Sequence, residues 1–202
     1  MKRIPLKRST PSLAGFIFGS LVMAPLAVQA HILPGSGQTF VAGLAHPLLG
    51  LDHLVAMLGV GLLAAQRGGR ALWLLPAVFV GVMTVGGILG SIGISLPMVE
   101  TAILISLLAF GALILSARSA NLRTIATLAG AFALFHGHAH GTEIGSATGL
   151  TYVPGMAATT AALLVAGMVF GLAANSASKG LWIRYAGGGI MVCGCAIGIG
   201  TL

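Results

Sequence analysis

Six long apolar stretches, separated by short polar connections, make up most of the chain after its first 30 residues. A helix needs about 20 mostly apolar residues to cross a bilayer, and each stretch has roughly that length. The stretches lie at residues 40–65, 71–90, 97–116, 122–141, 152–174 and 181–201. The pattern predicts an all-α integral membrane protein with six transmembrane helices, which form one domain over residues 31–202.

The composition agrees with this prediction and excludes several other classes of protein. Apolar residues make up 57% of the chain and charged residues 6%, whereas average soluble domains carry about 25% charged residues. A water-soluble globule and an intrinsically disordered chain are both excluded. The formal net charge is +7, but four of the ten bases lie within residues 1–8 and the others are scattered. We therefore predict no nucleic-acid partner.

The first 30 residues have the pattern of a secretory signal peptide. A basic start at residues 2–8 is followed by an apolar stretch at 13–26 and by Val28-Gln29-Ala30 at the cleavage site. Cleavage would make His31 the mature N-terminus, where the free amine and the imidazole together could chelate a divalent metal. The alternatives are an uncleaved anchor helix and, for His31, an accidental position in a tail.

Basic residues border only three of the five connections between the predicted spans. These are the connections after the first, third and fifth spans, and the bases are Arg67, Arg70, Arg118, Arg123, Lys179 and Arg184. Because cytoplasmic loops are enriched in Lys and Arg, both mature termini are expected to face the periplasm of a bacterial inner membrane. Three crossings in each half also give the halves opposite orientations, which is the arithmetic of a 3+3 inverted repeat.

Ionisable side chains are few in the predicted spans and cluster in three of them. Such residues are costly inside a membrane and by default mark a functional site. A lone membrane histidine is often a hydrogen-bonded packing residue, but five histidines and three acids together are hard to explain in that way. The predicted metal ligands are His46, Asp52, His53, Glu100, His136, His138, His140 and Glu143.

The spacing in the first predicted span places three of these residues around one cavity. His46 and His53 are seven residues apart and share a helix face, with Asp52 about 100° round from His53. Pro47 disfavours α geometry at the residue before it, so we expect His46 to cap or kink the helix. Such a break would expose backbone carbonyls as further oxygen ligands.

The spacing in the fourth predicted span gives one continuous stripe of ligands. His136, His140 and Glu143 stand at i, i+4 and i+7. His138 points away from this stripe if the helix persists. The glycines at 137 and 141 weaken the helix, which leaves open an unwound segment that turns His138 inward.

Depth along the helices separates the predicted ligands into two tiers. With about 1.5 Å of rise per residue, counted from the flanking arginines, His53 and His136 lie at roughly 20 Å. The residues at roughly 25–32 Å are His46, Glu100, His140 and Glu143. We expect this outer tier of imidazoles and carboxylates to lead to an inner pair of histidines with Asp52, as a stepwise path for a cation requires.

The ligand types favour a late first-row divalent cation. Imidazole nitrogens suit zinc, copper, nickel and cobalt, and the lack of a thiolate in the cluster disfavours Cu(I). Cys193 and Cys195 lie two residues apart on different faces of the last span, and we interpret them as packing residues. Ligand types alone do not rank nickel above cobalt or zinc.

Two motifs together resemble the signature of the HupE/UreJ family of nickel permeases. One is HPLLGLDHLVAM at residues 46–57, and the other is FHGHAHGTE at residues 135–143. The resemblance implies uptake of nickel, sometimes cobalt, for hydrogenase or urease maturation. Matched by motif, the polar residues of the family fall on His46, Asp52, His53, Glu100, His140 and Glu143.

The preferred hypothesis is a secondary permease, not an enzyme, that takes Ni²⁺ or Co²⁺ as its substrate and has no prosthetic group. The sequence has no G-x-x-x-x-G-K-[ST] nucleotide motif, so the membrane potential or proton exchange would supply the energy. The runner-up is an intramembrane zinc-dependent hydrolase, which needs three protein ligands, an open position and a base. Bis-histidine haem ligation is a third interpretation.

Overall fold

Every regular element in the described part of the chain is a helix. The structure is a computed structural model, and it describes residues 39–116, 120–144, 149–178 and 180–200. The elements are α2 (Phe40–Ala45), the 3-10 helix η1 (His46–Leu48), α3 (Leu51–Arg67), α4 (Ala71–Ser91), α5 (Val99–Ser116), α6 (Leu122–Ile144), α7 (Gly149–Ser178) and α8 (Leu181–Gly198). The predicted all-α fold is confirmed for these residues. The predicted signal peptide at residues 1–30 and His31 lie outside them.

The first predicted span is broken rather than continuous, since α2 with η1 meets α3 at an angle of 81°. Pro47 lies in the first turn of η1, where its missing N–H costs no helical hydrogen bond. His46 is the C-cap of α2, as expected, but it keeps helical dihedral angles of φ −58° and ψ −48°. The change to extended backbone occurs at Gly50, directly before α3 begins. The break leaves His46 and His53 on two differently directed helices.

Four helical segments are long and apolar enough to cross a membrane, namely Ala71–Ser91, Val99–Ser116, Thr151–Ser176 and Leu181–Gly198. The bent pair Phe40–Leu48 and Leu51–Arg67 passes the same test as one broken span, which gives up to five. The chain is therefore a multi-pass membrane protein. The 23 residues of α6 are not among these candidates, because its histidines and Glu143 lower its hydropathy. That α6 crosses as the sixth span stays a prediction.

Glycines hold the helices close together. The closest helix pairs are α4 with α6, α3 with α7 and α5 with α8. A Cβ on Gly86 would overlap a backbone carbonyl of α6, and a Cβ on Gly137 would overlap one of α4. Gly61 faces a carbonyl of α7 in the same way, and Gly111 packs on α8. Small residues let helix backbones approach closely, and α4 and α6 touch through their backbones at these glycines.

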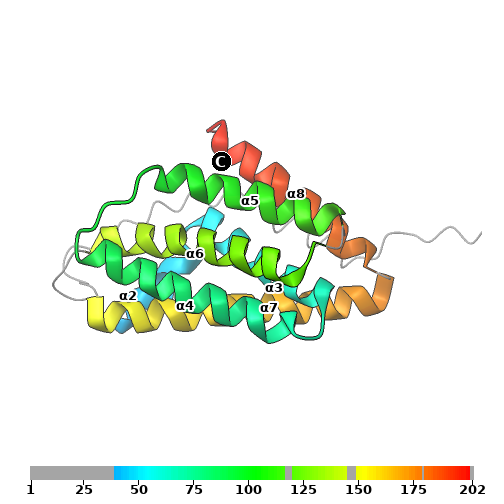
Figure 1. Cartoon of the computed structure of the whole chain (residues 1–202), viewed down its shortest axis with the longest axis horizontal. Helices are drawn as coiled ribbons and strands as arrows, with labels where there is room; N and C mark the ends of the chain where they lie inside the picture. Colours follow the sequence, from blue (N-terminus) through cyan, green and yellow to red (C-terminus); the bar gives the residue numbers. More distant parts are fainter. Residues whose placement is uncertain (1–38, 117–119, 145–148, 179, 201–202) are drawn as a thin grey trace, which may run out of the picture.

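The arrangement of the helices follows these pairs (Figure 1). α5 and α8 lie along one side, α4 and α7 along the opposite side, and the histidine-bearing helices α3 and α6 lie between them. Exchanging the first three and the last three predicted spans turns the pair α3–α7 into α6–α4 and returns α5–α8 to itself. This is the pairing that a 3+3 repeat would produce. α3 and α6 are not close backbone neighbours, and imidazole side chains fill the space between them.

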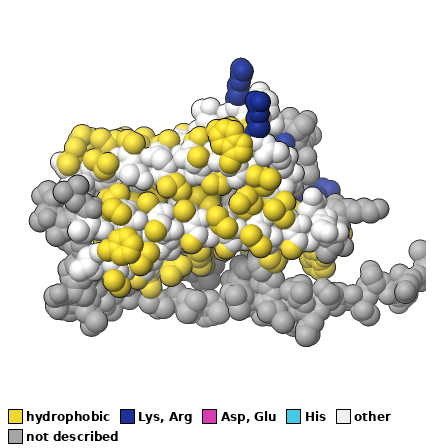
Figure 2. All heavy atoms as spheres, turned by 90° about the horizontal axis from the view of Figure 1, so that it is seen from below, with side chains coloured by type: hydrophobic (Ala, Val, Ile, Leu, Met, Phe, Trp, Pro, Cys, Tyr) yellow, Lys and Arg dark blue, Asp and Glu magenta, His cyan; other side chains and the backbone are white. Residues whose placement is uncertain are grey.

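The surface fits a lipid environment and gathers basic groups toward one end. The face in Figure 2 is mostly hydrophobic, and the basic side chains visible on it lie in one half of the long axis. At the C-terminal end of α5, Arg67 Nη1 donates to the carbonyl of Ala120 at 3.3 Å, and Arg184 Nε donates to that of Leu115 at 2.9 Å. These bases therefore meet at one end of the bundle, as the loop pattern predicts. Arg118 and Lys179 lie outside the described residues.

Candidate metal centre

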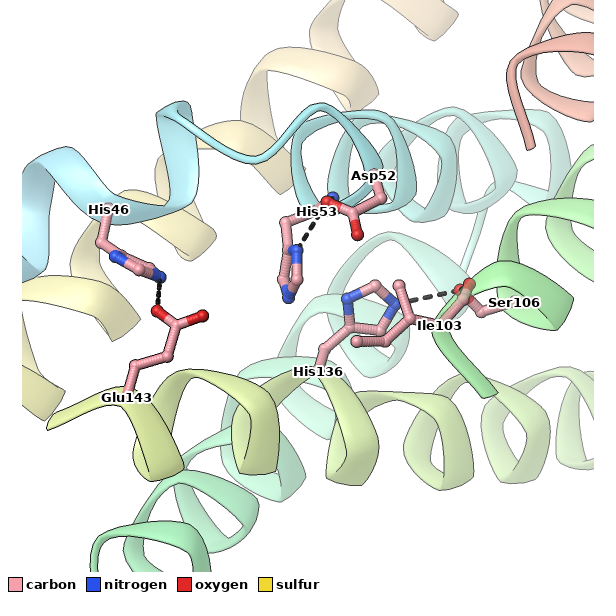
Figure 3. A network of polar contacts seen from close by, with 7 residues as sticks. All are labelled: His46, Asp52, His53, Ile103, Ser106, His136 and Glu143. Atoms are coloured by element: carbon pink, nitrogen blue, oxygen red, sulfur yellow. Dashed lines mark hydrogen bonds and ion pairs between the residues drawn. The ribbon is translucent and has the colours of Figure 1, made fainter. Parts of the chain in front are cut away.

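Polar side chains from η1, α3, α5 and α6 form one cluster beside the break in the first span (Figure 3). The cluster consists of two groups at different depths. We call His46, His140 and Glu143 the mouth group, because it includes an exposed carboxylate. We call Asp52, His53, Ser106 and His136 the deep group, because its histidines are buried.

The mouth group is a set of three ligand-type side chains that could hold a metal ion. His46 Nε2 lies 2.9 Å from Glu143 Oε2, and the His140 ring centroid lies 4.6 Å from that of His46. One ligand atom from each of the three residues lies within 4.8 Å of the other two. The Glu143 side chain is 55% exposed and that of His46 is 16% exposed, whereas His140 is only 2% exposed. The group therefore leads from the surface into the interior.

In the deep group, Asp52 fixes the orientation of His53. Asp52 Oδ1 accepts from the backbone N–H of His53 at 2.8 Å and pairs with His53 Nδ1 at 2.8 Å. A carboxylate only accepts hydrogen bonds, so the proton of neutral His53 lies on Nδ1. Its Nε2 is buried and has no hydrogen-bond partner among the described residues. A carboxylate behind the imidazole is the usual support of a histidine that ligates a metal.

Ser106 performs a similar role for His136. Ser106 Oγ donates to the carbonyl of Ile103 at 2.6 Å and therefore accepts from His136 Nε2, 2.9 Å away. The lone pair of His136 is then on Nδ1, which is buried without a partner in the described structure. The His53 and His136 rings lie 4.8 Å apart. Two imidazoles with defined tautomers thus meet in a buried space between α3 and α6.

His140 lies between the two groups. Its ring centroid is 4.6 Å from that of His46 and 4.2 Å from that of His53. Neither ring nitrogen has a partner among the residues that the structure describes. Since unpaired buried polar atoms are costly, His140 is a candidate ligand rather than a plain packing residue.

The structure brings together the residue pairs that depth along the helices predicts, but it leaves two predicted ligands outside. His138 projects from another face of the continuous α6, where its Nε2 contacts the Ile94 carbonyl at 2.6 Å. It therefore ties α6 to the α4–α5 connection. Glu100 is exposed in the first turn of α5, where water and the positive end of the helix dipole stabilise a carboxylate. Neither residue belongs to the three-residue group that could hold a metal.

Ser106 belongs to the cluster but is not among the ligands predicted from the sequence. Its position carries a weak signal, because it is a single polar residue in the middle of the apolar α5. A serine in a membrane helix commonly bonds back to its own backbone, and Ser106 does so. Its second contact, with His136, depends on how α5 packs beside α6. The packing of α5 beside α6 could not be predicted from the sequence.

The cysteines stay outside the cluster. Cys193 is buried and Cys195 is exposed, and both are free thiols on α8. Cys193 belongs to the hydrophobic core, as its interpretation as a packing residue requires. The ligand-capable atoms of the centre are therefore imidazole nitrogens and carboxylate oxygens, which suit nickel, cobalt and zinc.

The fold and the cluster define a class of protein: a multi-pass helical membrane protein with a histidine and carboxylate centre between its helices. The family model of the HupE / UreJ protein matches residues 19–197, and the chain belongs to this family. The chain is also similar to Protein HupE of Rhizobium leguminosarum bv. viciae, with 41% identity over 179 residues that cover 87% of this chain and 92% of that protein. No solved structure matches the chain significantly. The expected family membership is confirmed.

Proposed function

We propose that this protein is a secondary permease that carries Ni²⁺, or Co²⁺, across the bacterial inner membrane to supply hydrogenase or urease maturation. The HupE/UreJ family is associated with such transport, and the chain matches this family over most of its length. One observation carries the proposal: imidazole nitrogens without a partner among the described residues continue from His140 of the mouth group through His53 to the fully buried His136. A cation could follow these nitrogens from water into the interior.

The mouth group is suited to the capture of a hydrated cation. Glu143 offers a negative charge at the surface, and His46 and His140 offer nitrogen ligands behind it. Three protein ligands leave coordination positions for water, so the ion loses its hydration shell in steps. In the deep group, Asp52 compensates part of the charge of the ion. A site of partial coordination also releases its ion more easily than a closed one.

The membrane potential would supply the energy for inward movement. It is worth about 2.3 kcal/mol per elementary charge at 100 mV, and hence roughly 4.6 kcal/mol for a divalent cation. With the basic end of the bundle toward the cytoplasm, the mouth group faces the periplasm, from which the ion enters.

Transport is favoured over zinc-dependent hydrolysis by the spread of the ligands. A hydrolase needs three ligands and a base around one open position. Here the nitrogens of His46, His140, His53 and His136 follow one another in a row of neighbouring rings. A row of this kind suits a path better than one compact catalytic centre.

The proposal is tested by accumulation of radioactive nickel at nanomolar concentration in a bacterium that lacks its own nickel permease. His53→Ala should abolish uptake while membrane levels of the protein stay normal. His138→Gln is the matched control, since it alters a buried histidine of the same bundle outside the cluster and keeps an N–H donor for the Ile94 carbonyl. Normal uptake by His53→Ala would refute the proposal. Cobalt and zinc as competitors would establish the selectivity.

A further inference from the structure

The His140 ring lies beside one histidine of each group, and its nitrogens have no hydrogen-bond partner in the described structure. It is 2% exposed, and its ring lies 4.6 Å from His46 and 4.2 Å from His53. Both of its nitrogens are buried without a partner among the described residues. Every other histidine of the cluster has at least one nitrogen engaged, by Glu143, Asp52 or Ser106.

The chemistry of imidazole limits how this ring can act. A neutral imidazole has one protonated nitrogen and one lone pair, so His140 can ligate one cation at a time. With the mouth group it would complete a set of two nitrogens and one oxygen. With His53 and His136 it would complete a set of three nitrogens. The two sets are adjacent, and His140 is the member that they have in common.

We propose that the cluster has two alternative cation positions that share His140 as a ligand, an inference that rests on the proposed function. The mouth position uses His46, Glu143 and His140. The deep position uses the Nε2 of His53, the Nδ1 of His136 and His140. The cation keeps His140 as a ligand while its other protein ligands are exchanged, so it is never held by water alone.

The two positions differ in how close together their ligand atoms already lie. Among the described residues, the mouth group is the set whose three ligand atoms all lie within 4.8 Å of one another. The imidazoles of the deep position must turn toward the ion before all three can bind it. Asp52 and Ser106 limit this turning by holding the outer nitrogens of His53 and His136. The deep position should therefore bind more weakly than the mouth position.

Sharing His140 has a consequence for stoichiometry. If the ring serves either position but not both, a saturated chain holds one cation. Two independent sites would hold two. Repulsion between two divalent ions on neighbouring rings also disfavours a second bound cation, because the buried environment screens charge poorly. The ligand set of the bound ion should then depend on which partner is removed.

The test uses the full chain purified in detergent, with Co²⁺ as the probe and visible absorption, metal content and X-ray absorption as readouts. Wild type should bind one Co²⁺ per chain. Glu143→Gln should still bind one Co²⁺, more weakly and with imidazole as its protein ligand. His140→Ala should weaken binding by more than about tenfold, since it removes a ligand of both positions. His138→Gln is the control and should bind like wild type.

Several results would overturn shared ligation. They are two Co²⁺ per wild-type chain, wild-type affinity in His140→Ala, or a folded Glu143→Gln protein that binds none. Helicity and elution volume establish that each variant is folded. If wild type binds two Co²⁺ and His140→Ala still takes up nickel, sharing is wrong and the permease stands. If wild type neither binds Co²⁺ nor takes up nickel, both proposals fail.

Discussion

Replacing Ser106 by alanine removes the hydrogen bond that orients His136 and leaves His53 and His136 in place. The hydroxyl accepts from His136 Nε2 at 2.9 Å and is fully buried with it. In the free variant, His136 can relieve its unpaired N–H by changing its tautomer or turning its ring. With a cation on Nδ1 it can do neither, because Nε2 must then carry the proton. The penalty therefore falls on the bound state.

The size of the effect follows from this difference. A buried donor without a partner costs about 1–3 kcal/mol, and each 1.36 kcal/mol is a factor of ten in an equilibrium constant. We therefore expect the affinity of the deep position for a cation to fall roughly 5- to 160-fold in Ser106→Ala. Removal of a residue that supports a metal ligand typically costs 10- to 100-fold, so the two estimates overlap.

The assay is a Co²⁺ titration of the purified Glu143→Gln protein, in which the deep position takes the ion, with and without Ser106→Ala. Ser91→Ala is the matched control, because Ser91 Oγ makes the same bond to a carbonyl three residues back, with Ile88 at 2.8 Å, on a different helix. It should leave the Co²⁺ affinity unchanged. Ser106→Thr keeps a hydroxyl and should restore much of the loss. The same Co²⁺ affinity with and without Ser106→Ala would refute the role assigned to the serine.

Three further changes test other contacts. Gly137→Ala places a Cβ against an α4 carbonyl and should cost about 1–3 kcal/mol of stability, measured as a lower unfolding temperature in detergent. Gly81→Ala, where a Cβ meets nothing within 4 Å, is the control and should keep the wild-type unfolding temperature. Equal unfolding temperatures for the two variants would contradict the packing. Asp52→Asn keeps an acceptor for His53 but loses the charge. In the Glu143→Gln protein, where the deep position takes the ion, it should weaken Co²⁺ binding about 10- to 100-fold in a titration, and unchanged binding would contradict its role. Glu100 lies outside the cluster, so Glu100→Gln should leave the Co²⁺ spectrum and affinity unchanged. A changed spectrum would place Glu100 at the metal.

Much of the fold could be predicted from the sequence, because five of the six apolar stretches each correspond to one helix. The cap at His46 could also be predicted, since Pro47 disturbs the helix locally. The change of direction at Gly50 could not be located, because Pro47 is tolerated in the first turn of η1 and His46 keeps helical angles. The pairing of α4 with α6 and of α3 with α7 depends on contacts between distant residues. Glycines permit close helix crossings, but their spacing does not say which helices cross.

The candidate site could be predicted where helical geometry decides it. His136, His140 and Glu143 share a stripe because α6 is continuous, and for the same reason His138 points elsewhere. Glu100 was grouped with the ligands by its depth along a helix. Depth does not say which way a side chain points. The exposed position of Glu100 in the first turn of α5 separates it from the histidines.

The central claim is that a divalent cation crosses the membrane through this histidine cluster. The most direct measurement is nickel entry into sealed proteoliposomes that contain a trapped fluorescent chelator, with a membrane potential negative inside. Wild-type protein should bring nickel to the chelator, the rate should rise with the potential, and His53→Ala vesicles should stay at the level of protein-free vesicles. Equal nickel entry into wild-type and His53→Ala vesicles, or no entry above protein-free vesicles in either, would contradict the account.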